Sequence, residues 1–333
     1  MKPALVLPAA ALPRTNRWMP VVLTALLALP AAAGAQCPVG ATGADQASMV
    51  LRLKKGETHR VLSTSDQTTT QTVMGQQQTM HEVTKMGIRF DVLGQGENGQ
   101  HRIRITYESV SVDATTPMSS FSWSSADTTK PVPQGAEMFA ALVGHGYTVA
   151  MDPDGSNRHV EGWDSVSAHL MDVLPVPPGS SADQRKEMLK NNVGENIFGA
   201  ALKGAVVVMP SKAAAVGDSW SCTSHTGGSL GLSSTSTWTV DSRSGGVTAL
   251  KVASEMKSDS AASMSMGAMT VHYALEGTST STAQIQDATG WILRLRSESD
   301  VTGTATVEGS PMGPMEIPMS VKSTTTTEPM SGG

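Results

Sequence analysis

The sequence has few charged residues, few aromatic residues and only two cysteines. Charged residues make up 16% and aromatic residues 4% of the 333 positions. Two cysteines exclude a fold held together by a dense disulfide framework. The 24 Lys and Arg residues do not gather into basic clusters, and nucleic-acid binding depends on such clusters. We therefore expect no nucleic-acid partner.

The sequence also lacks an apolar run of the roughly 20 residues that a membrane-spanning helix needs. The apolar run that could be considered for such a helix is Val21 to Leu29. It follows three basic residues and precedes the small residues Ala33-Gly34-Ala35. This order is typical of a signal peptide. We expect cleavage after Ala35, and hence an exported protein, periplasmic or extracellular, with no stable membrane span. An uncleaved anchor is the alternative for residues 1–35.

Removal of residues 1–35 takes away three cations and no anions, so the balance becomes 24 − 3 − 29 = −8 over 333 − 35 = 298 residues. The mature chain is acidic. Gln36 directly before Cys37 departs from a lipobox, so we expect no lipid anchor. In an oxidising compartment a disulfide between Cys37 and Cys222 is predicted; a mobile thiol and a buried one are the alternative.

Catalytic residues are not evident. Gly217-Asp218-Ser219 matches the start of a serine-hydrolase signature, but such a nucleophile needs a histidine to take its proton. No Asp-x-x-His occurs in the chain. Asp152, Asp154 and Asn157 resemble calcium ligands, yet Glu161 is not at the spacing of a calcium loop, and a turn is the preferred interpretation. The sequence predicts a non-enzymatic protein and implies no cofactor.

Methionine is abundant, with 20 residues. Met264, Met266 and His272 lie close together in the sequence and are soft ligands that an exported protein could use for Cu(I). Thioethers also fill gaps in apolar cores, and that interpretation is preferred. We therefore predict no metal site and keep these three residues as candidates.

Two flanks of the chain have the period-two alternation of β-strands. In the first, residues 36–133, Met86, Ile88 and Phe90 alternate with polar residues, and the glycine-rich stretch from 94 to 99 predicts a hairpin. The alternation slips after Tyr107, which predicts a bulge near Glu108 or Ser109. The second flank covers residues 211–328, and we expect Trp220, Trp238 and Trp291 to anchor its core. Residues 329–333 are expected to be a disordered tail.

The middle, residues 134–210, carries the helical signal. It predicts a short helix over 136–143, a strand ending at Met151, the Asp152–Gly155 turn and a helix capped by Asp164. A second long helix is expected from about Ser181, with one apolar face packed on a sheet. The fold class predicted is α+β, with a strongly curved, mostly antiparallel sheet from two related halves packed around a central helical segment.

The two flanks share a similar order of turns. Lys55-Gly56-Glu57 corresponds to Val216-Gly217-Asp218, the Gly94 hairpin to Ser244-Gly245-Gly246, and Asp154-Gly155 to Thr289-Gly290. Turns of this kind predict an internal repeat. Whether the halves share one sheet is left open.

The succession Leu51-Arg52-Leu53-Lys54-Lys55-Gly56, Met74-Gly75-Gln76, Asp152-Pro153-Asp154-Gly155 and Val216–Trp220 resembles an uncharacterised family of exported bacterial proteins, a domain of unknown function. The general plan is also similar to the periplasmic lipoprotein-carrier superfamily. That resemblance implies a curved sheet around helices that shelters an apolar cavity.

These observations favour an exported binding or carrier protein for an apolar, lipid-like molecule, since flexible methionine side chains suit varied apolar ligands. The alternatives are a structural or interaction module that binds another component of the cell envelope without a small-molecule ligand, and the copper protein considered above.

Overall fold

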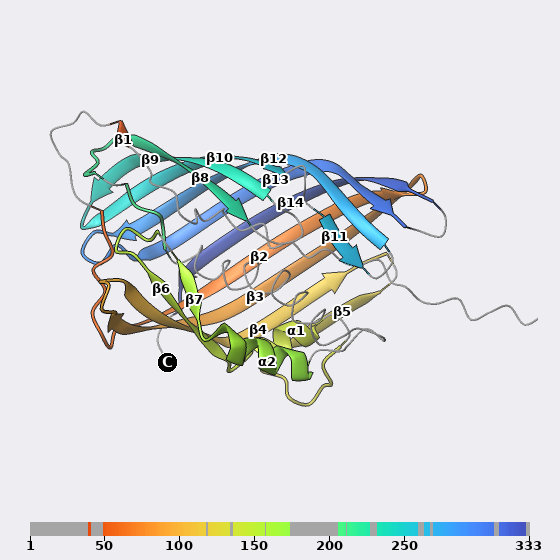
Figure 1. Cartoon of the computed structure of the whole chain (residues 1–333), viewed down its shortest axis with the longest axis horizontal. Coiled ribbons are helices and arrows are strands. Elements are labelled where there is room, and N and C mark those ends of the chain that lie inside the picture. The colour runs from red at the N-terminus through yellow and green to blue at the C-terminus, as the bar shows by residue number, and fades with distance from the viewer. Residues whose placement is uncertain are drawn as a thin grey trace, which may run out of the picture.

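The protein is nearly all β-structure. The computed structural model describes residues 39–40, 49–117, 119–133, 136–156, 158–173, 206–210, 212–226, 232–258, 263–266, 269–309 and 313–330. All named strands join one antiparallel, 14-stranded sheet with the order β1-β8-β9-β10-β12-β13-β14-β2-β3-β4-β6-β7, with β11 added beside β12 and β5 beside β4. Figure 1 shows the sheet twisting and curving along its length. The predicted α+β class with a central helical segment is therefore wrong.

Strands in the middle of the sheet are long, and those at its edges are short. Those of the first flank and the middle are β1 (Val39–Gly40), β2 (Thr58–Val73), β3 (Gln76–Gln95), β4 (His101–Thr115), β5 (Ser120–Ser124), β6 (Gly146–Met151) and β7 (His159–Glu161). Those of the second flank are β8 (Ser219–Thr226), β9 (Leu232–Ser244), β10 (Val247–Ser258), β11 (Ser263–Met266), β12 (Met269–Gln286), β13 (Ile292–Glu308) and β14 (Met315–Pro329).

Helices account for little of the described chain. They are α1 (Glu137–Leu142) and α2 (Trp163–Val173), both near the β4 side of the sheet (Figure 1). These two helices, β6 and the turn at Asp152–Gly155 agree with the predictions for the middle of the chain, except that α2 begins at Trp163, so Asp164 lies in its first turn and not at its N-cap. The long helix expected from about Ser181 lies outside the described residues. No helix within the described ranges is long and apolar enough to cross a membrane.

The buried residues that alternate along β3 and β4 lie on one face of the sheet. The helices α1 and α2 pack on this face, which we call the inner face. Phe90, Ile103 and Ile105 are each 0% exposed. The register shifts where Gly87 pairs with Ser109 and Ile88 with Tyr107, which leaves Glu108 as the extra residue. The predicted bulge is therefore confirmed, and it explains how apolar residues on both sides of it reach one core.

The N-terminal core is closed by helices. Apolar residues of β2, β3, β4 and β6 pack against Phe139 and Leu142 of α1 and Leu170 of α2. Trp291 also joins it, with its ring 5.1 Å from that of Phe90. Trp291 was expected in the core of the second half, so this tryptophan links the two parts of the chain.

The C-terminal core is closed by a loop segment. Val207, Val208 and Met209 pack with Trp220, Trp238 and neighbouring strand residues. The two indole rings stack at 6.2 Å, and the Trp220 Nε1–H donates to the Val208 carbonyl over 3.2 Å. The prediction that Trp220 and Trp238 anchor this core is confirmed.

Two turns at the starts of β2 and β8 make the same hydrogen bonds. The Gly56 N–H donates to the Val92 carbonyl and the Gly217 N–H to the Val240 carbonyl. The carboxylate of Glu57 accepts from the Lys54 N–H at 3.0 Å, and that of Asp218 from the Ala215 N–H at 2.7 Å. The segments before these strands also correspond: Arg52 N–H donates to the Thr289 carbonyl, and Met209 N–H to the Asp154 carbonyl. The segment before β2 thus contacts the turn before β13, and the segment before β8 contacts the turn after β6.

A third apolar group, the distal cluster, lies on the inner face toward the β11 side. Its buried members are Leu232, Met256, Val271, Tyr273, Leu275, Val301, Ala305 and Val307, with Met315, Ile317 and Met319 partly buried against them. All of them come from strands. Within the described ranges no helix or loop residue joins the distal cluster.

Candidate functional site

Between the C-terminal core and the distal cluster, the inner face carries buried hydroxyl groups. One row of paired positions crosses six strands, and a second row lies two residues away along β12, β13, β14 and β2 and continues onto β3. We call these residues the polar belt: Ser236, Ser254, Ser279, Ser299, Ser323 and Gln67 in the first row, and Ser281, Ser297, Thr325, Ser65 and Thr84 in the second. Each is less than 9% exposed.

Most belt hydroxyls bond each other across neighbouring strands. Ser236 and Ser254 lie 2.8 Å apart between their Oγ atoms, Ser299 and Ser323 2.7 Å, and the Ser281 hydroxyl donates to that of Ser297 over 3.0 Å. Such pairs satisfy groups that would otherwise be costly to bury. The polar belt is therefore a built part of the sheet interior.

Ser279 is the exception in the first row. Its two neighbours in the row, Ser254 and Ser299, are bonded to the serines on their far sides, Ser236 and Ser323. Ser279 Oγ is therefore buried without a partner. Ser234 and Thr327, each near the belt, also have unpartnered buried hydroxyls. An unsatisfied buried hydroxyl costs about 1–3 kcal/mol. Three buried hydroxyls on this face thus lack a hydrogen-bond partner.

The inner face has little charge. From β9 through β14 and on β2, the buried inner positions are apolar residues, Ser, Thr or Gln. Glu82 on β3, at the end of the first row, is half-buried and accepts from the Thr84 hydroxyl over 2.9 Å. The outer face differs, because Thr, Lys, Glu and Asp alternate with the buried residues along the same strands.

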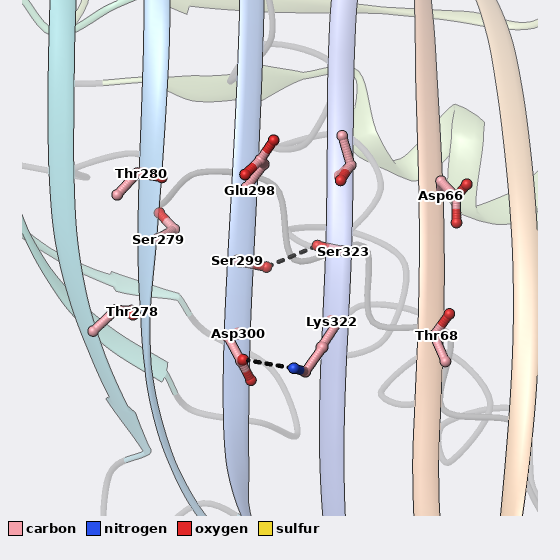
Figure 2. Close-up of a pocket in the computed structure, with 11 residues that line it drawn as sticks. Asp66, Thr68, Thr278, Ser279, Thr280, Glu298, Ser299, Asp300, Lys322 and Ser323 are labelled. Carbon is pink, nitrogen blue, oxygen red and sulfur yellow. Dashed lines mark hydrogen bonds and ion pairs between the residues drawn. The ribbon is translucent and has the colours of Figure 1, made fainter.

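A depression of about 470 Å³ lies on the side of Asp66, Glu298 and Asp300, over β12, β13, β14 and β2 (Figure 2). Its charges are already paired. Asp300 lies 3.2 Å from Lys322, Asp66 lies 2.8 Å from His81, and Glu298 lies 2.6 Å from Arg296. Paired, exposed charges of this kind explain a solvated surface, so we do not take the depression as the site.

The candidate copper ligands remain a prediction. In the register of β11 with β12, Met264 pairs with Val271 and Met266 with Met269, while Ser263 pairs with His272. His272 Nε2 lies 3.7 Å from a carboxylate oxygen of Glu308. Among the described residues no group of three or more His, Cys, Asp and Glu side chains could hold a metal ion.

The hydrolase-like residues have structural partners. Asp218 caps the turn before β8, and the Ser219 hydroxyl lies 2.8 Å from that of Thr239. A Gly-x-Ser-x-Gly match at residues 227–231 escaped the sequence interpretation, and it lies outside the described residues. It connects two antiparallel strands, β8 and β9, whereas the hydrolase motif joins a strand to a helix.

The candidate calcium ligands also have other roles. Asp154 Oδ1 accepts from both the N–H and the hydroxyl of Ser156, which is the bonding of a turn. The Asp152 carboxylate accepts from the Gln100 amide over 2.8 Å. Asn157 lies outside the described residues.

Cys222 lies on β8 and is 5% exposed. No cysteine in the described part of the chain is a free thiol. Cys37 lies outside the described residues, so the pairing of the two stays a prediction.

The chain belongs to a family of unknown function, DUF6263, whose model matches residues 98–292. This supports the resemblance to an uncharacterised family, and it brings no activity with it. No curated protein matches the chain.

Solved structures similar to this one share little sequence with it. A lipovitellin structure described for its lipid–protein interactions has 10% identity and a TM-score of 0.41; the match covers 84% of this chain and 26% of that chain. Pseudomonas aeruginosa OccK7 (OpdD) has 9% identity and a TM-score of 0.20, with 83% of this chain and 100% of that chain covered. The chain therefore spans about a quarter of the lipovitellin chain, and neither likeness carries a function.

Proposed function

We propose that the protein is an exported, non-enzymatic binding or carrier protein that holds an apolar, lipid-like molecule on the inner face of its sheet. The observation that carries the proposal is the distal cluster. Its eight buried side chains are at most 9% exposed, yet the described residues that pack there come from the sheet itself.

The contrast between the two faces supports the same proposal. A sheet with a polar outer face and an apolar inner face buries the inner face against something else. The N-terminal core uses helices and the C-terminal core uses residues 207–209. An apolar ligand would cover the distal cluster in the same way. Export is supported by the signal-peptide pattern of residues 1–35.

The test is to purify the full chain from its own compartment and extract it with organic solvent. We expect native mass spectrometry to show a bound lipid-like molecule that extraction removes. The extracted protein should then bind the uncharged apolar dye N-phenyl-1-naphthylamine.

A matched pair of variants tests which face of the sheet binds the ligand. Met319→Trp puts a larger side chain on the partly buried inner face and should lower the amount of bound molecule. Lys322→Trp changes an outer residue of the same strand, 70% exposed at its side chain, and should leave binding unchanged. A correctly folded protein that yields no molecule and binds no dye overturns the proposal and favours an envelope module with a filled interior.

A further inference from the structure

The first row of the polar belt contains five serines, of which four are bonded in two pairs. Ser236 pairs with Ser254 and Ser299 with Ser323, so the central Ser279 is left without a partner. Ser279 is 5% exposed. A protein that only needed a filled interior would gain stability from alanine at this position, because alanine removes the unsatisfied hydroxyl. The hydroxyl is instead available for a hydrogen bond to a bound molecule.

The surroundings of Ser279 exclude a charged partner. The paired inner positions on both sides are serines, and the next residues of the row are Gln67 and the half-buried Glu82. The one Lys or Arg at a described inner position of β9, β10, β12, β13, β14 or β2 is Arg243, opposite Thr248 at the end of β9 and beyond Val240 from Ser236. No cation lies at the described inner positions around Ser279. An ionised carboxylate or phosphate buried there would lose its hydration without gaining a cation, at a cost of several kcal/mol. A neutral hydroxyl, ester or amide can bond a serine at no such cost.

The apolar part of the ligand has a defined direction. Along β12 the inner positions after Ser279 are Gly277, Leu275, Tyr273 and Val271, and the last three belong to the distal cluster. A strand rises about 3.4 Å per residue, so Ser279 and Val271 are about 27 Å apart. A hydrocarbon chain lying along β12 would contact apolar side chains over much of this length.

At Gly277 the sheet has no room for a side chain. A Cβ atom there would lie 2.4 Å from the Asp300 carbonyl oxygen and 2.7 Å from Val301 Cα. The glycine therefore lets β12 and β13 approach closely at the boundary between the polar belt and the distal cluster.

We infer that the ligand is an uncharged amphiphile whose hydroxyl, ester or amide group bonds Ser279 in the polar belt while its hydrocarbon chain lies on the distal cluster. This inference rests on the proposed function, because it names the chemistry of the molecule that the inner face holds.

The first experiment displaces N-phenyl-1-naphthylamine from the extracted full-length protein at pH 8 with three competitors of equal chain length. They are 1-monooleoylglycerol, oleate and the corresponding alkene without a polar group. We expect the monoacylglycerol to compete best, because it alone combines the chain with neutral hydrogen-bonding groups. Oleate competing as well as the monoacylglycerol would overturn the inference while leaving the proposed function intact. Absence of any dye binding would overturn both.

The second experiment uses Ser279→Ala. Loss of one hydrogen bond should weaken monoacylglycerol binding about three- to tenfold and leave alkene binding unchanged. Thr280→Ala, an exposed residue on the opposite face of the same strand, is the matched control and should change neither. Unchanged monoacylglycerol affinity in Ser279→Ala would refute the role of this hydroxyl.

A stability measurement separates binding from folding. Without ligand, Ser279→Ala should be as stable as the wild type or more stable, since its hydroxyl has no partner. Ser299→Ala removes a 2.7 Å hydrogen bond to Ser323 and should be less stable. A marked loss of stability in ligand-free Ser279→Ala would show that the hydroxyl serves the fold, and the inference would fail.

Discussion

The N-terminal core and the distal cluster lie on the same face of one sheet, but they are closed differently. In the N-terminal core, Phe90, Ile103 and Ile105 are fully buried, and helix residues such as Leu142 and Leu170 pack over the strands. Exposed fractions reach 9% in both groups, but the described members of the distal cluster are all strand residues. Under the proposed function, this difference separates a part of the inner face that is permanent structure from a part that holds a partner able to leave.

The largest effect is expected for Phe90→Ala in the N-terminal core. Phe90 is 0% exposed and contacts Trp291, so its loss should lower the free energy of unfolding by about 3–5 kcal/mol. Urea unfolding measures this. Leu93→Ala, at a 39% exposed position on the same strand, should change it little. A small loss at Phe90 would mean that the helices do not close this core tightly.

The second prediction concerns the sheet edge beside the C-terminal core. Val39 pairs with Trp220 and Gly40 with Ser219. Continuing this register by two residues would bring Cys37 opposite Cys222, as a cross-strand disulfide requires. We expect Cys222→Ser to cost about 2–4 kcal/mol, and Cys37→Ser to cost the same. Peptide mapping without reductant checks the bond; alkylation of both native thiols would contradict it.

A leucine pair tests the comparison directly. Leu250→Ala in the C-terminal core, where Leu250 is 1% exposed, should cost about 3–4 kcal/mol. Leu275→Ala in the distal cluster should cost about 2 kcal/mol in the extracted protein, because part of its surroundings is the ligand. Thermal unfolding with and without monoacylglycerol measures both losses. The ligand should stabilise the proteins whose distal cluster is intact, and not Leu275→Ala. Equal losses of stability in the two variants would mean that the distal cluster is closed as tightly as the C-terminal core.

The equivalent turns before β2 and β8 predict a smaller effect. Asp218 is 9% exposed and accepts the Ala215 N–H over 2.7 Å, so Asp218→Ala should cost about 1–3 kcal/mol. The Glu57 carboxylate is 31% exposed at the corresponding place, and Glu57→Ala should cost about 0.5 kcal/mol. Urea unfolding of both variants measures the difference. A larger loss of stability in Glu57→Ala would show that burial of the carboxylate does not determine the size of the effect.

The smallest effect is a pH dependence from His59. Burial lowers the pKa of His59, which stacks on Trp291 at 4.3 Å, while Glu57 opposes the shift. The unfolded chain therefore takes up this proton first, near pH 6.5. Stability should fall as the pH drops through 6.5 toward the lower folded pKa. His59→Gln should flatten this part of the pH profile in thermal unfolding; an identical slope would exclude His59 as the cause.

The sequence predicted those strands whose inner residues are apolar. Met86, Ile88 and Phe90 alternate with polar residues, and the parity slip after Tyr107 located the bulge at Glu108. Turns were also predictable, because glycine supplies the positive φ that Gly56 and Gly217 adopt, 89° and 90°.

The polar belt was not predictable from apolar alternation. On β12, Ser279 and Ser281 occupy inner positions between Leu275 and Ala283. The alternation of apolar and polar residues therefore stops there, although the strand continues. The helical pattern of residues 134–210 therefore predicted the wrong fold class. A usable signal is present in Thr278-Ser279-Thr280-Ser281-Thr282, where the β-branched residue is exposed and the small residue is buried at every step.

The pairing of β14 with β2 has a kinetic consequence. Pro329 pairs with Val61 and Met319 with Gln71, so residues near opposite ends of the chain are neighbours in the middle of the sheet. Until β14 arrives, β2 presents an open edge of unpaired backbone groups, which is a template for association between chains. Contacts between such distant residues form slowly. A folding chain is therefore open to association through the edge of β2 until β14 pairs with it.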